Sequence, residues 1–197
     1  FQTLVALAIG MPERLVELAR KQEAEDGSAY AFINSQAQKE ALWAAQDLSD
    51  YLEGQGYRSI PMADLADNSY PTIGKTGRNM PDLRANAPYA AAAGLGQLGR
   101  NGMLLTPEFG PRLRFVFVLT DAVLDETPRY QGPNLCLKDC TRCSEACPVC
   151  ALSANDTETV CIGGVERYEV MKRHEIRCAW ARSLGMVEGE GSGQLGW

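Results

Sequence analysis

The chain has 197 residues, which is the size of one domain or of one domain with a small appendage. Its 45% of hydrophobic and 22% of charged residues are typical of a globular protein, and no apolar run approaches the roughly 20 residues that a membrane-spanning helix needs. The 19 basic and 25 acidic residues give a net charge of −6, which argues against a nucleic-acid partner held by phosphate contacts, and the single histidine, His174, excludes a zinc site built from two or more histidines.

The start of the chain predicts a buried strand, because FQTLVALAIG at residues 1–10 is a nearly continuous apolar run. A natural protein rarely begins inside a strand, and this chain begins with Phe rather than Met. We therefore expect further sequence upstream, and the question of an export signal stays open.

Two helices are predicted next. The first covers residues 12–25, and the second begins at the capping-box pattern of Ser35 and Gln38 and ends at Gly54, after about 18 residues. The apolar stripe of the second helix consists of Ala41, Ala45, Leu48 and Leu52. Because these residues recur at helical spacing, we expect them to face the core.

The following segments predict a mixed α+β fold. A short strand is expected over residues 58–62, a long loop over 63–81, an alanine-rich helix over 82–93 and a strong strand over 112–120. We expect an α/β core over residues 1–129.

The composition changes at about residue 130, where a cysteine-rich segment begins and runs to residue 197. None of the seven cysteines lies in residues 1–135, and five of them fall between Cys136 and Cys150. Cys161 and Cys178 follow, and the stretch after Cys178 is rich in glycine and is expected to be a loop. A tight cluster with an odd count favours metal ligation over a disulfide scaffold, and so favours a reducing, cytoplasmic location.

The cysteine run CLKDCTRCSEACPVC resembles the bacterial ferredoxin pattern C-x2-C-x2-C-x3-C-P. Cys140, Cys143 and Cys147, with the proline that follows, fit its last three cysteines, and they are predicted to bind iron. Cys136 stands one residue too far upstream, and we expect it to be the fourth ligand, with the extra residue absorbed as a bulge. Cys150 is the competitor, although it is expected at a helix start. A zinc site remains an alternative.

A glycine-rich stretch matches the dinucleotide-binding pattern G-x-G-x-x-G at Gly94, Gly96 and Gly99, with Asp121 placed 22 residues after the last glycine. That pattern must follow a strand and open a helix, whereas here it follows a predicted helix and leads into a strand. The glycines are therefore interpreted as turn residues, or as positions where the backbone passes close to a flat group.

The stretch AGLGQLGRNGMLLTPEFGPRLRFVFVLTD, followed by CTRCSEACP, resembles the catalytic domain of reductive dehalogenases and of the related epoxyqueuosine reductases. The resemblance covers roughly residues 85–150. It implies a core similar to flavin nitroreductases that holds a corrinoid (cobalamin), and a ferredoxin-like segment with [4Fe–4S] clusters. The closing C-x2-C-x3-C-P run of the family is absent here, so one cluster, or two, is expected.

The resemblance also implies site residues. The corrinoid-lining positions would be Gly94, Leu95, Gly96, Gly99, Arg100, Asn101, Gly102, Thr106, Pro107, Glu108, Phe109 and Gly110. The metal ligands would be Cys136, Cys140, Cys143, Cys147 and Cys178.

A reductive reaction at a corrinoid needs a proton source, and the candidates are Tyr89, Asp82 and Arg100. Each has a structural alternative: an aromatic on a helix face, a helix N-cap and an ion-pair partner, respectively. The predicted function is a corrinoid-dependent iron–sulfur oxidoreductase of the reductive dehalogenase-like family, which passes electrons from a [4Fe–4S] cluster to a cobalt-bound substrate site. The substrate would be a small molecule, and the electrons would come from a low-potential donor of the ferredoxin or flavodoxin type. The alternative is a corrinoid-free protein that delivers electrons to a partner.

Overall fold

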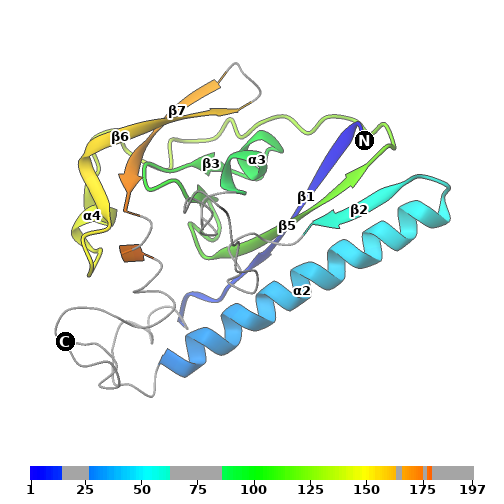
Figure 1. Cartoon of the computed structure of the whole chain (residues 1–197), viewed down its shortest axis with the longest axis horizontal. Coiled ribbons are helices and arrows are strands. Elements are labelled where there is room, and N and C mark those ends of the chain that lie inside the picture. Colours follow the sequence, from blue (N-terminus) through cyan, green and yellow to red (C-terminus); the bar gives the residue numbers. More distant parts are fainter. Residues whose placement is uncertain (15–26, 63–85, 163–165, 175–176, 179–197) are drawn as a thin grey trace, which may run out of the picture. The chain divides into compact units, whose positions relative to one another are not determined.

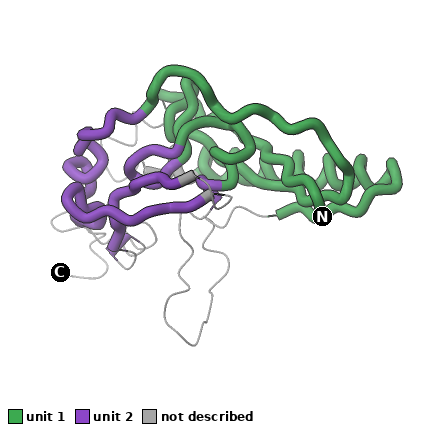
Figure 2. The backbone as a smooth tube through the Cα atoms, turned by 90° about the horizontal axis from the view of Figure 1, so that it is seen from above, with its two compact units in different colours: residues 1–64, 89–97, 104–135 green, residues 65–88, 98–103, 136–197 purple. Residues whose placement is uncertain are grey.

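The computed structural model describes residues 1–14, 27–62, 86–162, 166–174 and 177–178. The chain forms two compact units, which Figure 2 colours separately. Unit 1 takes its described residues from 1–64, 89–97 and 104–135, and unit 2 takes its described residues from 65–88, 98–103 and 136–197.

Unit 1 is built on a three-stranded antiparallel sheet in the order β1-β5-β2. The strands are β1 (Thr3–Gly10), β5 (Leu113–Thr120) and β2 (Ser59–Met62). In the central strand, Thr120 pairs with Thr3 on one side and with Ser59 on the other. All three strands lie where the sequence predicts them, because each is a short apolar or β-branched run bounded by turn residues.

The long helix α2 (Gly27–Gly54) runs along the sheet of unit 1 (Figure 1). Ala41 and Ala45 are fully buried and pack, with Leu52, against Val116 and Val118 of β5. The small alanine side chains let the helix lie close to the sheet, so the predicted apolar stripe is confirmed as the core contact.

The beginning of α2 differs from the prediction, whereas its last residue is Gly54, as predicted. The helix begins at Gly27, so Ser35 lies inside it and is not an N-cap. Beyond Gly54, the peptide N–H of Tyr57 donates to the Leu52 carbonyl and that of Gly56 donates to the Glu53 carbonyl, while Gly56 has a φ of +89°. This is a Schellman ending, and the glycine that it requires is Gly56.

The next elements of the chain are short. Helix α3 (Ala87–Ala92) is followed by β3 (Gln97–Leu98) and β4 (Leu104–Leu105), which form a two-stranded sheet. The boundary between the units passes through β3. The predicted loop over 63–81 lies outside the described residues, as does most of the helix predicted over 12–25.

Unit 2 contains α4 (Arg142–Glu145) and a hairpin of β6 (Leu152–Ile162) and β7 (Glu166–Arg173), as Figure 1 shows. The pairing shifts register between Leu152 and Thr157. No strand is predicted in this stretch, yet Val170 and Met171 of β7 are each 1% exposed and anchor the hairpin. The sequence carries only a weak signal, since Thr157, Thr159 and Val160 of β6 are β-branched. The glycine-rich stretch after Cys178 lies outside the described residues.

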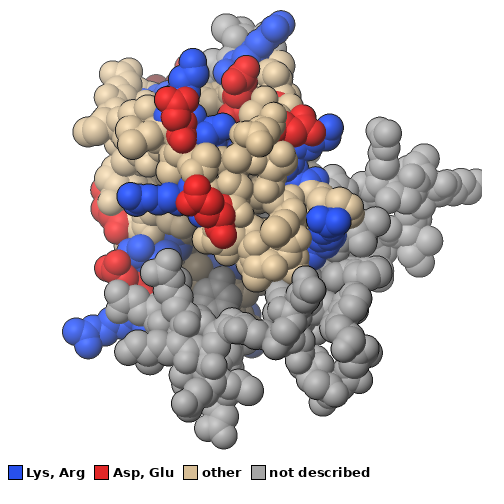
Figure 3. All heavy atoms as spheres, turned by 90° about the vertical axis from the view of Figure 1, so that its left-hand side faces the viewer, with Lys and Arg blue, Asp and Glu red and all other residues tan. Residues whose placement is uncertain are grey.

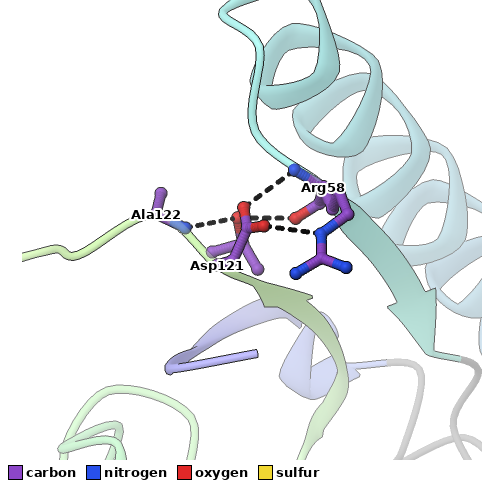
Figure 4. A network of polar contacts seen from close by, with 4 residues as sticks. Arg58, Asp121 and Ala122 are labelled. Atoms are coloured by element: carbon purple, nitrogen blue, oxygen red, sulfur yellow. Dashed lines mark hydrogen bonds and ion pairs between the residues drawn. The ribbon is translucent and has the colours of Figure 1, made fainter.

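A polar clamp joins the start of β2 to the end of β5 in unit 1 (Figure 4). The Asp121 carboxylate accepts hydrogen bonds from the Arg58 peptide N–H at 2.8 Å and from Arg58 Nε at 2.7 Å. Thr120 Oγ1 donates to the Arg58 carbonyl and accepts from the Ala122 N–H. The two hydrogen bonds from Arg58, that of its side chain first, lower the pKa of Asp121. Asp121 therefore links the two strands β2 and β5. The glycines of the G-x-G-x-x-G match follow helix α3 and lead into strands, and this order confirms that the match is not a dinucleotide fingerprint.

Charged side chains of both signs are interspersed over the described residues of the face that Figure 3 shows. One exposed ion pair, between Lys172 and Asp156 at 3.1 Å, links the two strands of the hairpin in unit 2. Within the described ranges, no helix combines the length and the apolar character that crossing a membrane requires.

Candidate functional site

The cysteine segment of unit 2 consists of two tight turns around one short helix. The Cys140 peptide N–H donates to the Leu137 carbonyl at 3.1 Å, which closes the turn between Cys136 and Cys140. Cys143 lies on α4, and Cys147 follows four residues later, just beyond its C-cap. The Cys147 N–H donates to the Ser144 carbonyl at 3.3 Å, which holds Cys147 close to the end of the helix.

Three of the thiols interact electrostatically. Burial raises the pKa of the Cys143 thiol, and negative charge on Cys136 and on Cys140 raises it further. A hydrogen bond from Asn101 acts in the opposite direction and lowers that pKa. Thiolates that destabilise one another in the apoprotein are suited to a shared cationic group, which removes the repulsion.

N–H groups are directed at the sulfur atoms. The Arg100 peptide N–H donates to Cys136 Sγ at 3.3 Å, and Asn101 Nδ2 donates to Cys143 Sγ at 3.4 Å. The Ala151 peptide N–H donates to Cys147 Sγ at 3.2 Å. Sulfur ligands of iron–sulfur clusters accept hydrogen bonds of this kind, which tune the cluster.

The first two donors belong to one turn, Gly99–Met103 of unit 2. The Gly102 N–H donates to the Gly99 carbonyl at 2.8 Å, and the Gly99 N–H donates to the Met103 carbonyl at 2.8 Å. Gly102 has a φ of +77°. The bonds and the left-handed glycine define a three-residue hairpin loop with a glycine bulge, which the sequence Arg-Asn-Gly favours.

Arg100 ties this turn to the rest of unit 2. Its guanidinium donates from Nη1 to the Cys140 carbonyl at 2.8 Å and from Nη2 to the Ala154 carbonyl at 3.5 Å. Its own carbonyl accepts from the Met171 N–H of β7 at 2.5 Å. One residue therefore joins the cysteine turns, β6 and β7.

The three remaining cysteines, Cys150, Cys161 and Cys178, have different surroundings. Cys178 Sγ accepts from Arg173 Nη1 at 3.6 Å, so a cation faces this thiol. Cys161 is exposed on β6. Cys150 is exposed and has a φ of +46°, and its N–H donates to the Cys147 carbonyl. The expectation of a helix start at Cys150 is wrong, because the chain makes a left-handed turn there.

The chemistry of these side chains and N–H groups fits an iron–sulfur cluster. Cysteine thiolates are the ligands that such clusters use, and the N–H groups supply the hydrogen bonds that their sulfurs accept. Across the described ranges, no group of three or more His, Cys, Asp or Glu side chains is close enough to hold a single metal ion.

Two glycines of the predicted corrinoid loop, Gly94 and Gly96, have local tasks in unit 1. Gly94 has a φ of +85° and ends α3 in a Schellman motif, with the Leu95 N–H donating to the Ala90 carbonyl. A Cβ on Gly96 would lie 2.2 Å from the Leu105 carbonyl oxygen, so this glycine permits the close approach of its own chain. The interpretation as turn residues therefore holds for Gly94 and Gly102, while a role beside a macrocycle stays a prediction.

The segment from Thr106 to Gly110 is also a closed turn in unit 1. The Gly110 N–H donates to the Thr106 carbonyl at 2.8 Å, and the Phe109 N–H donates to Thr106 Oγ1 at 3.1 Å. The Phe109 ring lies over Gly10, where a Cβ would be 2.4 Å from it. Pro107 and Glu108 are exposed at the tip.

The three candidate proton donors have different surroundings. Tyr89 is 57% exposed, and its ring meets the edge of Phe117 at a centroid distance of 6.3 Å, in agreement with an aromatic on a helix face. The Arg100 guanidinium donates to two carbonyl oxygens, and a guanidinium does not give up its proton in proteins. Asp82 lies outside the described residues. Their catalytic role stays a prediction.

The sequence does not predict the residues that donate hydrogen bonds to the cysteine sulfurs. Arg100 and Asn101 were expected beside a corrinoid, and the structure places them against the cysteines of unit 2. Ala151 was not anticipated as a donor, since a peptide N–H leaves no trace in residue type. A long-range signal between residues 100 and 136 is absent from a single sequence, because nothing in residue spacing links them.

Known proteins are similar to parts of this chain in sequence and to most of it in fold. No protein-family model matches the chain. A tetrachloroethene reductive dehalogenase of Desulfitobacterium hafniense is 44% identical over 73 residues, which is 36% of this chain and 13% of that protein. An epoxyqueuosine reductase of Gloeobacter violaceus is 44% identical over 64 residues, which is 32% of this chain and 19% of that protein.

A solved reductive dehalogenase structure, described as suggesting a mechanism for B12-dependent dehalogenation, matches with a TM-score of 0.64 and 23% identity, over 91% of this chain and 23% of that one. The chain spans between 13% and 26% of the length of the curated relatives it matches. By sequence and by fold, the chain is therefore similar to reductive dehalogenases and to an epoxyqueuosine reductase, which are oxidoreductases.

Proposed function

We propose that this chain is the electron-transferring part of a reductive dehalogenase-like oxidoreductase, with an iron–sulfur cluster on its cysteine segment. One observation carries the proposal: the thiols of Cys136, Cys140 and Cys143 interact, and N–H donors from a single turn point at two of their sulfurs. The likeness to reductive dehalogenases supports it.

The ligands in this proposal are Cys136, Cys140, Cys143 and Cys147. When bound, a [4Fe–4S] cluster supplies a one-electron store that can accept an electron from a donor and release it toward a substrate. The protein's share is to hold the four thiols on two turns and the short helix α4, to donate hydrogen bonds to three of their sulfurs and to keep Arg100 beside them. Cys178, with Arg173 facing its sulfur, is a candidate ligand of a second cluster.

The finer part of the proposal is a corrinoid on an α/β core similar to flavin nitroreductases, lined by residues of the stretch from Gly94 to Gly110. The likeness to a structure described in terms of B12-dependent dehalogenation supports this part. The electron donor would be a low-potential protein of the ferredoxin or flavodoxin type, and the substrate would be a small molecule.

A corrinoid-free electron-transfer protein is the second candidate, and a specific observation favours it. Gly94, Gly96 and Gly102 are explained by contacts within their own units, and Arg100 and Asn101 donate to the cysteine segment. The contacts within the chain account for the residue types at these five positions, and no bound macrocycle is required to explain them.

The test is anaerobic reconstitution of the chain with iron and sulfide, followed by reduction with dithionite. The proposal predicts broad visible absorbance that bleaches on reduction, together with a paramagnetic signal of the reduced cluster. A chain that takes up iron but does not bleach would contradict it. Adding cobalamin to the reconstituted chain separates the two candidates, because only the corrinoid-dependent one retains cobalt after gel filtration.

A further inference from the structure

The Asn101 side chain is held in an orientation that presents its amide hydrogens to a cysteine. Its Oδ1 accepts the Met103 peptide N–H at 3.0 Å, and its Nδ2 lies 3.4 Å from Cys143 Sγ. A peptide N–H can only donate, so the carbonyl oxygen must face Met103. The NH2 group is thereby directed at the sulfur.

The turn that carries Asn101 is rigid. Gly102 with its φ of +77° and the paired bonds between Gly99 and Met103 fix the backbone on either side of the asparagine. The Arg100 guanidinium holds the same turn to the Cys140 carbonyl at 2.8 Å. Asn101 is therefore positioned before any cluster binds, and no side-chain ordering has to accompany its hydrogen bond.

A donor aimed at a cluster thiolate acts on the reduction potential. Reduction adds an electron to the cluster and increases the negative charge on its sulfurs, so an N–H···S bond stabilises the reduced form more than the oxidised form. Removing the donor should favour the oxidised form.

We infer that Asn101 is a positioning residue that raises the reduction potential of the cluster held by the cysteine segment, through the Nδ2–H···Sγ bond to Cys143. This inference rests on the proposed function. It gives the Asn of the Arg-Asn-Gly turn a task that a turn alone does not require.

Two substitutions remove the donor and keep the turn. Asn101→Asp retains an oxygen for the Met103 N–H and places a carboxylate oxygen toward Cys143. Asn101→Ser is neutral, is accepted in turns and is too short to reach the sulfur. Asn155→Asp adds the same charge at an exposed position of β6 and serves as the control.

The reconstituted full chain and the three variants are titrated by potentiometry with the paramagnetic signal as readout, and iron is counted in each. We expect Asn101→Ser to change the oxidised-to-reduced ratio at a fixed potential by about threefold to tenfold toward the oxidised form, up to about 59 mV for a one-electron couple. Asn101→Asp should shift the potential further in the same direction, and Asn155→Asp should leave it unchanged.

Full iron with the wild-type potential in both Asn101 variants would overturn the inference. So would an equal shift in Asn101→Asp and Asn155→Asp with no shift in Asn101→Ser, because the effect would then be one of charge alone. If one variant loses its iron, the other decides. Failure of the proposed function looks different: the unmodified chain itself would show no reducible cluster, and no variant would need to be compared.

Discussion

Different interactions stabilise the interior of each of the two units of this chain. In unit 1, the helix α2 covers a sheet face with fully buried alanines and valines, such as Ala45 and Val118. In unit 2, none of the residues of α4 is buried, and the cysteine turns are held by hydrogen bonds from Arg100 and Asn101.

The difference indicates where a cofactor contributes to folding. Burial of apolar surface stabilises unit 1 without any ligand. The cysteine turns of unit 2 bury little apolar surface, so ligation of the thiols is expected to contribute to their folding free energy. Substitutions in the two units should therefore separate loss of stability from loss of iron.

The largest effect is expected at the cysteines. Cys143→Ala should remove most of the iron and the visible absorbance after reconstitution, because a missing ligand opens a corner of the cluster. Cys161→Ala is the matched control, since its thiol is exposed on β6, and it should keep the iron content. If the single alanine variants of Cys140, Cys143 and Cys147 all retained their iron, these thiols would not be the ligands.

The next effect concerns the core of unit 1. Leu52→Ala should lower the free energy of unfolding of unit 1 by about 2–5 kcal/mol, because Leu52 is 6% exposed and its truncation leaves a cavity beside β5. Urea unfolding followed by circular dichroism measures the loss, and Leu137→Ala, at an exposed position, is the control. The iron content at low urea should equal that of the unmodified chain; a parallel loss of iron would show that the units are not independent.

A smaller effect is expected at Arg100. Arg100→Ala removes the bonds to the Cys140 and Ala154 carbonyls, which as charge-assisted bonds are worth about 1.5–3 kcal/mol before allowance for partial exposure. The cluster should then be released several-fold faster to a chelator, as followed by visible absorbance. Arg142→Ala, on the exposed side of α4, should release it at the unmodified rate. Equal release rates in the unmodified chain and in both variants would show that Arg100 does not stabilise the bound cluster.

The smallest effect is a pH dependence in unit 1. Hydrogen bonds from Arg58 lower the pKa of Asp121 below its usual 3.8, so the folded state favours the carboxylate. The stabilisation is complete above the pKa of the unfolded chain and is lost as the pH falls through the lower folded pKa.

In the iron-free chain, Asp121→Asn should therefore flatten the fall in unfolding free energy between about pH 5 and about pH 2. Asp47→Asn, on the exposed side of α2, is the control. An unchanged acid profile in Asp121→Asn would show that the clamp of Figure 4 does not contribute to stability.

Local patterns predicted the frame of unit 1. Strands β1, β2 and β5 are apolar runs between turn residues, and the stripe on α2 repeats at helical spacing, so each carries its own signal. The start of α2 was less accurate, because the capping-box pattern at Ser35 lies inside a helix that begins at Gly27. At the other end, the Schellman motif depends on which of two nearby glycines adopts a positive φ. Gly54 and Gly56 look equivalent in the sequence.

The candidate site was predicted only in part. Covalent spacing sets the cysteine pattern, and it can be seen in the chain alone. The contacts of Arg100 with Cys136 and Cys140 join residues 36 and 40 positions apart through a peptide N–H and a carbonyl, which every residue type carries. Such contacts follow from tertiary folding, which residue type does not encode locally.

The central claim is that the cysteine segment holds an iron–sulfur cluster, and one measurement tests it most directly. Iron, zinc and acid-labile sulfide are counted in the chain purified without oxygen. The account predicts about four iron and about four sulfide for each complete cluster, bound through the segment from Cys136 to Cys147. Zinc in place of iron, with no labile sulfide, would contradict it.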